Sequence, residues 1–126
     1  MAGSAYAVPV TSYELEVRES DLGEVTLVEL AGELDLTNAE ELQQRLDALA
    51  EEGSSLVLEL NKLRFLDSAA LHVLFRLAVR LSDDGRRLGV VLDASAPVAK
   101  TVELVSLDQA ADVRPSLSEL PAEPRA

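Results

Sequence analysis

Apolar and polar side chains alternate near the start of the chain and give way to continuous apolar runs further along. The alternation over residues 13–18 predicts a strand with one buried face. The apolar positions within residues 25–30 predict a second strand, which weakens near Gly32. The runs over residues 55–60 and 88–92 are apolar almost throughout, which is typical of strands covered on both faces.

Between these strands the apolar positions recur at helical spacing. A first helix begins where Thr37 and Glu40 fit a capping box, and it ends at Gly53. A second helix covers residues 68–82, and a third opens at Ser95. The apolar stripe of the second helix consists of Leu71, Leu74, Phe75, Ala78 and Leu81. The stripe of the third consists of Val98, Val102 and Val105.

The order of these elements predicts an α/β fold. Continuous apolar strands that alternate with helices form right-handed crossovers, so we expect a mixed, mainly parallel sheet of four to five strands flanked by three to four helices. The first strand or two form an antiparallel edge, and residues 111–117 hold a short last strand. A chain of 126 residues suits one domain. We predict this domain over residues 13–117, between a flexible N-terminal tail (1–12) and a disordered C-terminal tail (118–126).

Composition narrows the range of functions. The net charge is −12, and the first 60 residues carry all of it, with 14 acidic and 2 basic side chains. Nucleic-acid binding needs a basic patch and is therefore disfavoured. The acidic charge could instead attract a basic protein partner or simply keep the protein soluble. No apolar run approaches the ~20 residues of a membrane span. The absence of cysteine favours a cytoplasmic location. No glycine-rich phosphate loop occurs, so we expect no nucleotide cofactor.

The segment from Leu63 to Phe75 contains most of the candidate functional residues. An Asp-Ser pair, Asp67-Ser68, stands where the second helix begins. A phosphate on Ser68 would meet the free amides of the helix start and would add about −1.5 to −2 charges to a surface. The alternative is an ordinary helix cap provided by Asp67 or Ser68. The residues alone favour the cap.

Two aspartates and the single histidine allow a catalytic interpretation that other features oppose. Asp35 and Asp67 follow neighbouring strands, so their carboxylates could be neighbours at one edge of the sheet. They could act as an acid/base pair or simply lie at helix starts. His72 lies one helical turn after Ser68, but the glycines of a nucleophile elbow are missing. One histidine without cysteine also makes a metal site improbable. We therefore predict no enzyme.

The second helix has another face beside its core stripe. This face carries small and apolar residues, with basic side chains around them. Its members are Ala69, Ala70, Val73 and Leu77, bordered by His72, Arg76 and Arg80. The face could receive a partner, or a neighbouring helix of the same domain could cover Val73 and Leu77.

Three motifs resemble the STAS domain family, in particular the bacterial anti-sigma-factor antagonists. The segment 32–42 is similar to the family's G-x-[LI]-D motif and first helix. The segment 63–69 is similar to its strand-loop-phosphoserine signature, and the segment 95–100 to the start of its late helix. The resemblance covers residues 13–117. Many members have glycine where this chain has Ala70, and we expect the extra methyl group to stiffen the helix start and narrow the approach of a partner.

The resemblance implies a partner-switching function in sigma-factor-dependent transcription, as in stress responses. The unphosphorylated antagonist binds an anti-sigma factor, often a serine protein kinase, which releases it by phosphorylating the serine that corresponds to Ser68. A phosphatase resets the switch. The implied partner-binding residues are Asp35, Thr37, Asp67, Ser68, Ala69, Ala70, His72, Val73, Arg76 and Leu77. STAS domains also serve as non-phosphorylated subunits of signalling scaffolds or lipid-transport complexes, which is the alternative. The oligomeric state stays open.

Overall fold

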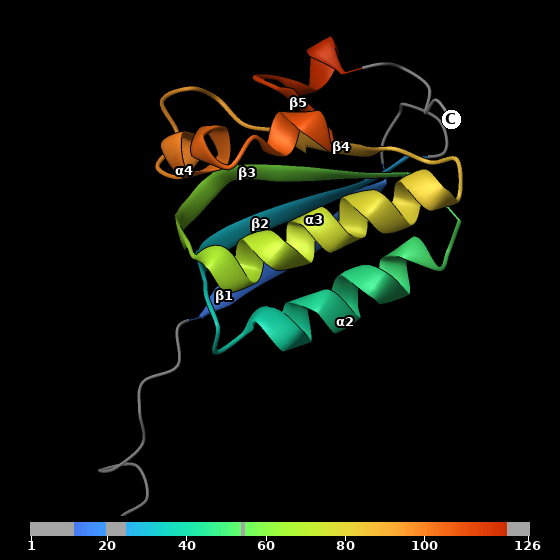
Figure 1. The fold of residues 1–126 in the computed structure, drawn as a ribbon, viewed down its shortest axis with the longest axis horizontal. Coiled ribbons are helices and arrows are strands. Elements are labelled where there is room, and N and C mark those ends of the chain that lie inside the picture. The colour runs from blue at the N-terminus through green and yellow to red at the C-terminus, as the bar shows by residue number, and fades with distance from the viewer. Residues whose placement is uncertain (1–11, 20–24, 54, 121–126) are drawn as a thin grey trace, which may run out of the picture.

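A computed structural model describes residues 12–19, 25–53 and 55–120. Its sheet has the order β1-β2-β3-β4-β5, in which β1 pairs with β2 antiparallel and all later neighbours are parallel (Figure 1). The strands are β1 (Tyr13–Glu19), β2 (Val25–Leu34), β3 (Ser55–Leu66), β4 (Leu88–Val91) and β5 (Asp112–Arg114). The predicted mixed, mainly parallel α/β fold is confirmed. Residues 20–24, between the first two strands, lie outside the described residues, as do residues 1–11 and 121–126 of the predicted tails.

Helices α2 (Ala39–Ala50) and α3 (Ser68–Asp83) lie side by side across one face of the sheet (Figure 1). The short helix α4 (Ala99–Leu104) and the 3₁₀ turn η1 (Leu107–Gln109) pack into the same core cluster. The helices pack in this way because each carries a stripe of apolar side chains at helical spacing, and this stripe must be buried against the sheet. The fully buried leucines of this core include Leu30, Leu42, Leu46, Leu58, Leu60, Leu74 and Leu81.

Strands β2 and β3 extend further than the apolar pattern predicts. Each continues to the edge where the candidate residues lie, through positions at which the register shifts. Gly32 makes this possible, because its φ of 98° favours glycine and a Cβ atom there would lie 2.6 Å from the Ser12 carbonyl oxygen. Strand β2 therefore continues through an irregular stretch as far as Leu34, although the sequence predicted that it would weaken near Gly32.

Two helix starts differ from the prediction. Helix α2 begins at Ala39, after Asn38, so Thr37 stands one residue too early to cap it as proposed. Helix α4 begins at Ala99 instead of Ser95, because the residues before it form a turn. Val98 and Val102 are buried as their spacing predicts, whereas Val105 is 37% exposed.

The other face of the sheet is covered in part by the end of the domain. The 3₁₀ turn η2 (Leu117–Glu119) and Leu120 form a second apolar cluster with Val25, Val57 and Val91. Residues 118–120 therefore belong to the folded domain, although the sequence analysis assigned them to the tail. Gly89 allows this packing, since a Cβ atom there would lie 3.3 Å from the Leu120 methyl carbons.

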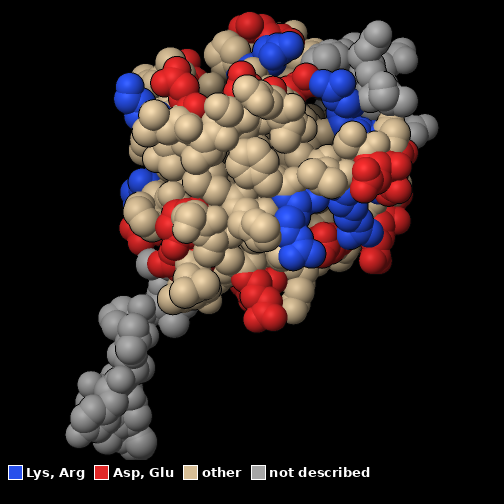
Figure 2. All heavy atoms as spheres, in the orientation of Figure 1, with Lys and Arg blue, Asp and Glu red and all other residues tan. Residues whose placement is uncertain are grey.

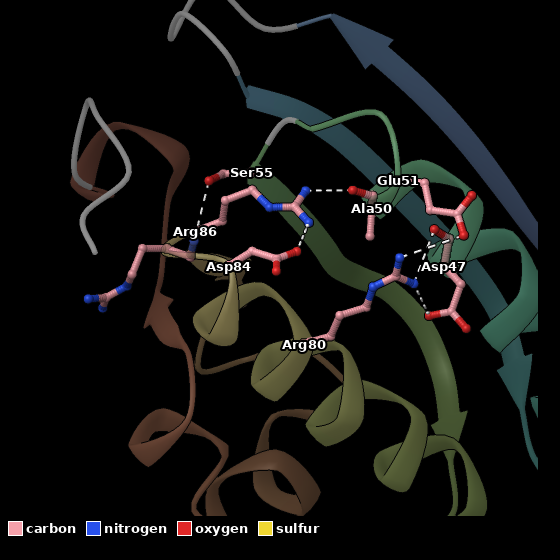
Figure 3. A network of polar contacts seen from close by, with 8 residues as sticks. Asp47, Ala50, Glu51, Ser55, Arg80, Asp84 and Arg86 are labelled. Carbon is pink, nitrogen blue, oxygen red and sulfur yellow. Dashed lines mark hydrogen bonds and ion pairs between the residues drawn. The ribbon is translucent and has the colours of Figure 1, made fainter.

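A network of arginines joins α2 and α3 at the ends of the two helices (Figure 3). Arg80 of α3 forms ion pairs with Asp47 at 3.1 Å and Glu51 at 3.7 Å. Arg86 donates to the Ala50 carbonyl oxygen at 2.5 Å and pairs with Asp84 at 2.7 Å. Basic groups near the final carbonyls of a helix also complement its dipole. The two helices are thus held together at this end, while their first turns lie at the opposite edge of the sheet (Figure 1).

Candidate protein-interaction site at the start of helix α3

The candidate site is formed where β2 and β3 end. Leu34 and Leu66 are the last paired residues of the two strands, so Asp35 and Asp67 leave the sheet beside one another. The Asp67 amide donates to the Leu34 carbonyl oxygen at 3.1 Å and joins the two strand ends. The expected proximity of the two aspartates at one edge of the sheet is confirmed.

The Asp67 carboxylate holds two segments together. One oxygen, Oδ1, accepts from the Ala70 amide at 3.1 Å, so Asp67 is the N-terminal cap of α3. The other, Oδ2, accepts from the Leu36 amide at 3.1 Å. One side chain therefore fixes the start of α3 and the loop between β2 and α2.

Because Asp67 caps the helix, Ser68 is its first helical residue and has no capping duty. Its side chain is exposed, and its hydroxyl forms no hydrogen bond with any residue that the structure describes. Amides in the first turn of a helix lack intrahelical partners and favour an anion. Of the two possible caps, the structure therefore selects Asp67 and leaves the Ser68 hydroxyl available to other molecules.

Asp35 also helps to organise the loop between β2 and α2. Its Oδ1 atom accepts from the Thr37 amide at 2.9 Å and from the Thr37 hydroxyl at 2.5 Å. The Asp35 amide donates to the Asn38 side chain at 3.0 Å. The two aspartates thus use their carboxylates to shape loops, which is the helix-start interpretation and leaves an acid/base pair without support.

A third strand end at this edge repeats the arrangement around Asp35. The Asp93 carboxylate accepts from the Ser95 amide at 2.9 Å and from the Ser95 hydroxyl. The hydrogen bond from the Ser95 hydroxyl is the main cause, followed by that from its amide, of a lowered pKa of the Asp93 carboxyl group. The turn that replaces the expected start of the third helix is built by these bonds.

A shallow groove of about 500 Å³ lies between the first turns of α2 and α3. It is lined by Leu36, Ala39, Glu40, Gln43, Ser68, Ala69, His72 and Val73. His72 is exposed and lies near Ser68 on one face of α3, but within the described residues no hydrogen bond joins it to Ser68 or Asp67. Arg76 is also exposed, and it lines a different groove with Phe75 and Val79. The Ser-His-Asp relay therefore has no geometric support.

Three of the predicted partner-binding residues are buried. Ala70, Val73 and Leu77 are 0%, 4% and 2% exposed, because α2 lies beside α3 and covers this side of it. The alternative in which a neighbouring helix covers Val73 and Leu77 is the one observed. The Ala70 methyl group lies in the core, so the expectation that it narrows a partner's approach was wrong, whereas its effect on the stiffness of the helix start stays a prediction.

Leu36 also lines the groove, although it was not among the residues predicted from the sequence. Its side chain is 76% exposed, although the residue stands between a buried strand and a helix. The available signal was a leucine two positions after the last inward-facing residue of β2, next to an aspartate that starts a turn. Of the predicted residues, the structure places Ser68, Ala69, His72 and Val73 around the groove, and Leu36 joins them there.

Two further features of residues 12–19, 25–53 and 55–120 concern metal ions and membranes. In these residues, no group of three or more His, Asp or Glu side chains is placed to hold a metal ion. Likewise, none of the helices described in these ranges has the length and apolar character needed to cross a membrane.

Comparison with solved structures identifies similar folds. A crystal structure of an anti-sigma factor antagonist from Mycobacterium paratuberculosis is 28% identical to the chain, with a TM-score of 0.75 over 86% of this chain and 90% of that one. The anti-sigma factor antagonist SpoIIAA in its unphosphorylated form is 17% identical, with a TM-score of 0.61 over 84% and 92% of the two chains. The murine anion transporter Slc26a9 is 20% identical, with a TM-score of 0.59 over 80% of this chain and 18% of the transporter. The last two likenesses concern the fold alone.

A search of curated protein sequences found no match. The sequence model of the STAS domain, in contrast, matches residues 14–120, which is most of the chain and almost all of its described part. The match includes β2, the Asp67-Ser68 pair and the turn of residues 118–120 that closes the second apolar cluster. The chain therefore belongs to the STAS domain family.

Proposed function

We propose that this protein is an anti-sigma-factor antagonist that is switched by phosphorylation of Ser68. In the unphosphorylated state it binds an anti-sigma factor of the serine-kinase type and so frees a sigma factor for transcription. Phosphorylation of Ser68 by that kinase releases it, and a phosphatase restores it. This function takes place in the cytoplasm and requires no cofactor and no catalysis by the antagonist itself.

The observation that carries the proposal is that Asp67, and not Ser68, caps helix α3. Asp67 caps α3, so the exposed Ser68 hydroxyl has no structural duty among the described residues. A kinase can therefore modify it without removing a bond on which the fold depends. The similarity to the mycobacterial antagonist, over most of both chains, supports the same assignment.

The electrostatics of the site support release after phosphorylation. A phosphoserine carries about −1.5 to −2 charges at neutral pH. Ser68 follows the Asp67 carboxylate directly, and Asp35 leaves the sheet beside Asp67. The added charge would raise the cost of burying this surface against a partner, because like charges must be desolvated together. The same charge is tolerated in the free protein, since the first turn of a helix favours an anion.

The test uses the purified kinase-type anti-sigma factor of the source organism, with ATP, followed by mass spectrometry of the full chain. We expect one phosphate, on Ser68, and no incorporation into the Ser68→Ala variant. Phosphate found elsewhere, or none on Ser68, would contradict the proposal.

Binding provides the second measurement. Ser68→Asp should weaken binding to the same kinase by about 100-fold, because a like charge in an interface costs several kcal/mol. Ser82→Asp makes the same change at an exposed position near the other end of α3 and should bind like the unmodified chain. Equal affinity of the two variants would favour a non-phosphorylated STAS subunit of a scaffold or lipid-transport complex.

A further inference from the structure

Leu36 is the most exposed of the large apolar side chains in the part of the chain that the structure describes, at 76%. Leu104, at the end of α4, is comparably exposed at 74% but lies outside the groove at Ser68. Single exposed leucines are common on protein surfaces and require no explanation by themselves. Leu36 differs from Leu104 in what holds it and in what lies next to it.

The backbone at Leu36 is fixed from several directions. Its amide donates to Asp67 Oδ2 at 3.1 Å, and this carboxylate also caps α3. On either side, Asp35 binds Thr37 and the Asn38 side chain. The exposed leucine is therefore presented by an ordered loop. A preorganised apolar group loses little conformational freedom on binding, which is a property of strong interface anchors.

Leu36 and Ser68 line the same groove between α2 and α3. Glu40 from the first turn of α2 and His72 from α3 complete its polar lining. Figure 2 shows an uncharged area on the face that carries the helices, with a group of basic and acidic side chains beside it and further charged groups around the margin. A partner that covers Ser68 would also cover Leu36 and would meet the Glu40 carboxylate.

We infer that Leu36 is the apolar anchor of the interface with the anti-sigma factor. The inference rests on the function proposed above and names the residue that gives that interface much of its affinity. The partner is a protein with an apolar socket for Leu36 and a basic side chain that faces Glu40. Asp67 is a positioning residue, because it holds Leu36 beside the Ser68 hydroxyl through its second carboxylate oxygen.

The first experiment measures the affinity of the full chain for the purified kinase-type anti-sigma factor of the source organism, without ATP. Leu36→Ser should weaken binding by about 30-fold, as expected for a central apolar anchor. Leu104→Ser removes an equally exposed leucine elsewhere and should change affinity by less than about twofold. Circular dichroism of both variants checks that they remain folded.

The outcomes separate this inference from the proposed function. If Ser68→Asp loses binding but Leu36→Ser binds like Leu104→Ser, the anchor is overturned and the switch stands. If Leu36→Ser loses binding while Ser68→Asp binds normally, the anchor is supported and the switch is overturned. If the unmodified chain does not bind the kinase at all, both are overturned.

The positioning role of Asp67 has its own measurement. In Asp67→Ser the hydroxyl oxygen can still cap the Ala70 amide but cannot also reach the Leu36 amide. Hydrogen exchange followed by NMR should then show faster exchange at Leu36, while the amides in the middle of α3 are unchanged. Binding should weaken, but by less than in Leu36→Ser. Unchanged exchange at Leu36 would overturn the positioning role.

Discussion

Three parallel strands of this sheet are followed at the same edge by an aspartate and then a hydroxyl group, but one pair behaves differently. After β2 and after β4, the residue with the hydroxyl group stands two positions beyond the aspartate. Both its hydroxyl group and its backbone amide donate hydrogen bonds to the aspartate carboxylate. After β3, Ser68 follows Asp67 directly. The Asp67 carboxylate bonds the Ala70 and Leu36 amides instead, and the Ser68 hydroxyl remains free of described partners.

A difference of one position in this spacing decides whether the hydroxyl group is bonded within the fold or available to other molecules. With one residue between them, an aspartate can fold back on the amide and hydroxyl that follow and close a small turn. With direct adjacency and a helix that starts at once, the aspartate becomes the cap and the serine becomes the first helical residue. Four substitutions test this comparison through stability or titration, in order of decreasing effect.

Asp67→Ala should have the largest effect on stability. It removes the cap of α3 and the bond to the Leu36 amide, and we expect a loss of about 2–3 kcal/mol in the free energy of unfolding. Urea unfolding followed by circular dichroism measures it. Asp67→Asn keeps one acceptor oxygen but replaces the other with an amide donor, so it should lose one of the two hydrogen bonds and only part of this free energy. Equal losses would mean that the cap geometry contributes little.

Thr37→Val should have an intermediate effect. The two side chains have nearly the same shape, but valine cannot donate to Asp35, so we expect a loss of about 1 kcal/mol in the same unfolding assay. Thr101→Val changes a half-buried threonine within α4 and serves as a comparison outside this edge. A Thr37 variant as stable as the natural chain would remove the distinction between bonded and free hydroxyls.

Ser95→Ala should change the titration of Asp93 more than it changes stability. The hydroxyl is the main cause of the lowered pKa, so its loss should move the pKa of Asp93 upward, towards the ordinary value of 3.8. Because a lowered pKa stabilises the fold above the unfolded-state pKa, this contribution disappears as pH falls through the folded pKa, and the variant should be less sensitive in that acidic range. NMR titration of the Asp93 carboxyl carbon gives the answer, and an unshifted curve would contradict it.

Ser68→Ala should have the smallest effect on stability. We expect a change within about 0.5 kcal/mol, because no described hydrogen bond is lost and alanine favours a helix. The unfolding assay used for Asp67 applies directly. A loss as large as that of Thr37→Val would show that Ser68 is part of the scaffold after all.

The order and type of the elements could be predicted because they depend on periodicity, which a single sequence displays. Leu71, Leu74 and Leu81 are buried as their spacing requires. The same helix also carries Val73 and Leu77 on a second apolar face, and periodicity cannot tell which structure covers it. That depends on α2 lying beside α3, a contact between segments distant in sequence.

The candidate site could be predicted in position but not in detail. Parallel strands place Asp35 and Asp67 at one edge, and this follows from the order of elements alone. Which amides their carboxylates bind depends on register shifts in β2 and β3 and on the left-handed backbone of Gly32. Leu36 escaped prediction for the same reason, since its exposure results from a turn that only the folded strand ends define.

The packing of Leu120 against β4 has a practical consequence for measurements on this protein. Leu120 lies with Val25, Val57 and Val91 on the face of the sheet away from α2 and α3, where Gly89 lets it approach the strand closely. The described part of the chain therefore leaves the sheet at Leu120 on this face, so an affinity tag, dye or surface linker added beyond Leu120 would be connected from this side. Such an attachment starts from a different face than the one that carries the Ser68 groove, and it would serve every variant compared above.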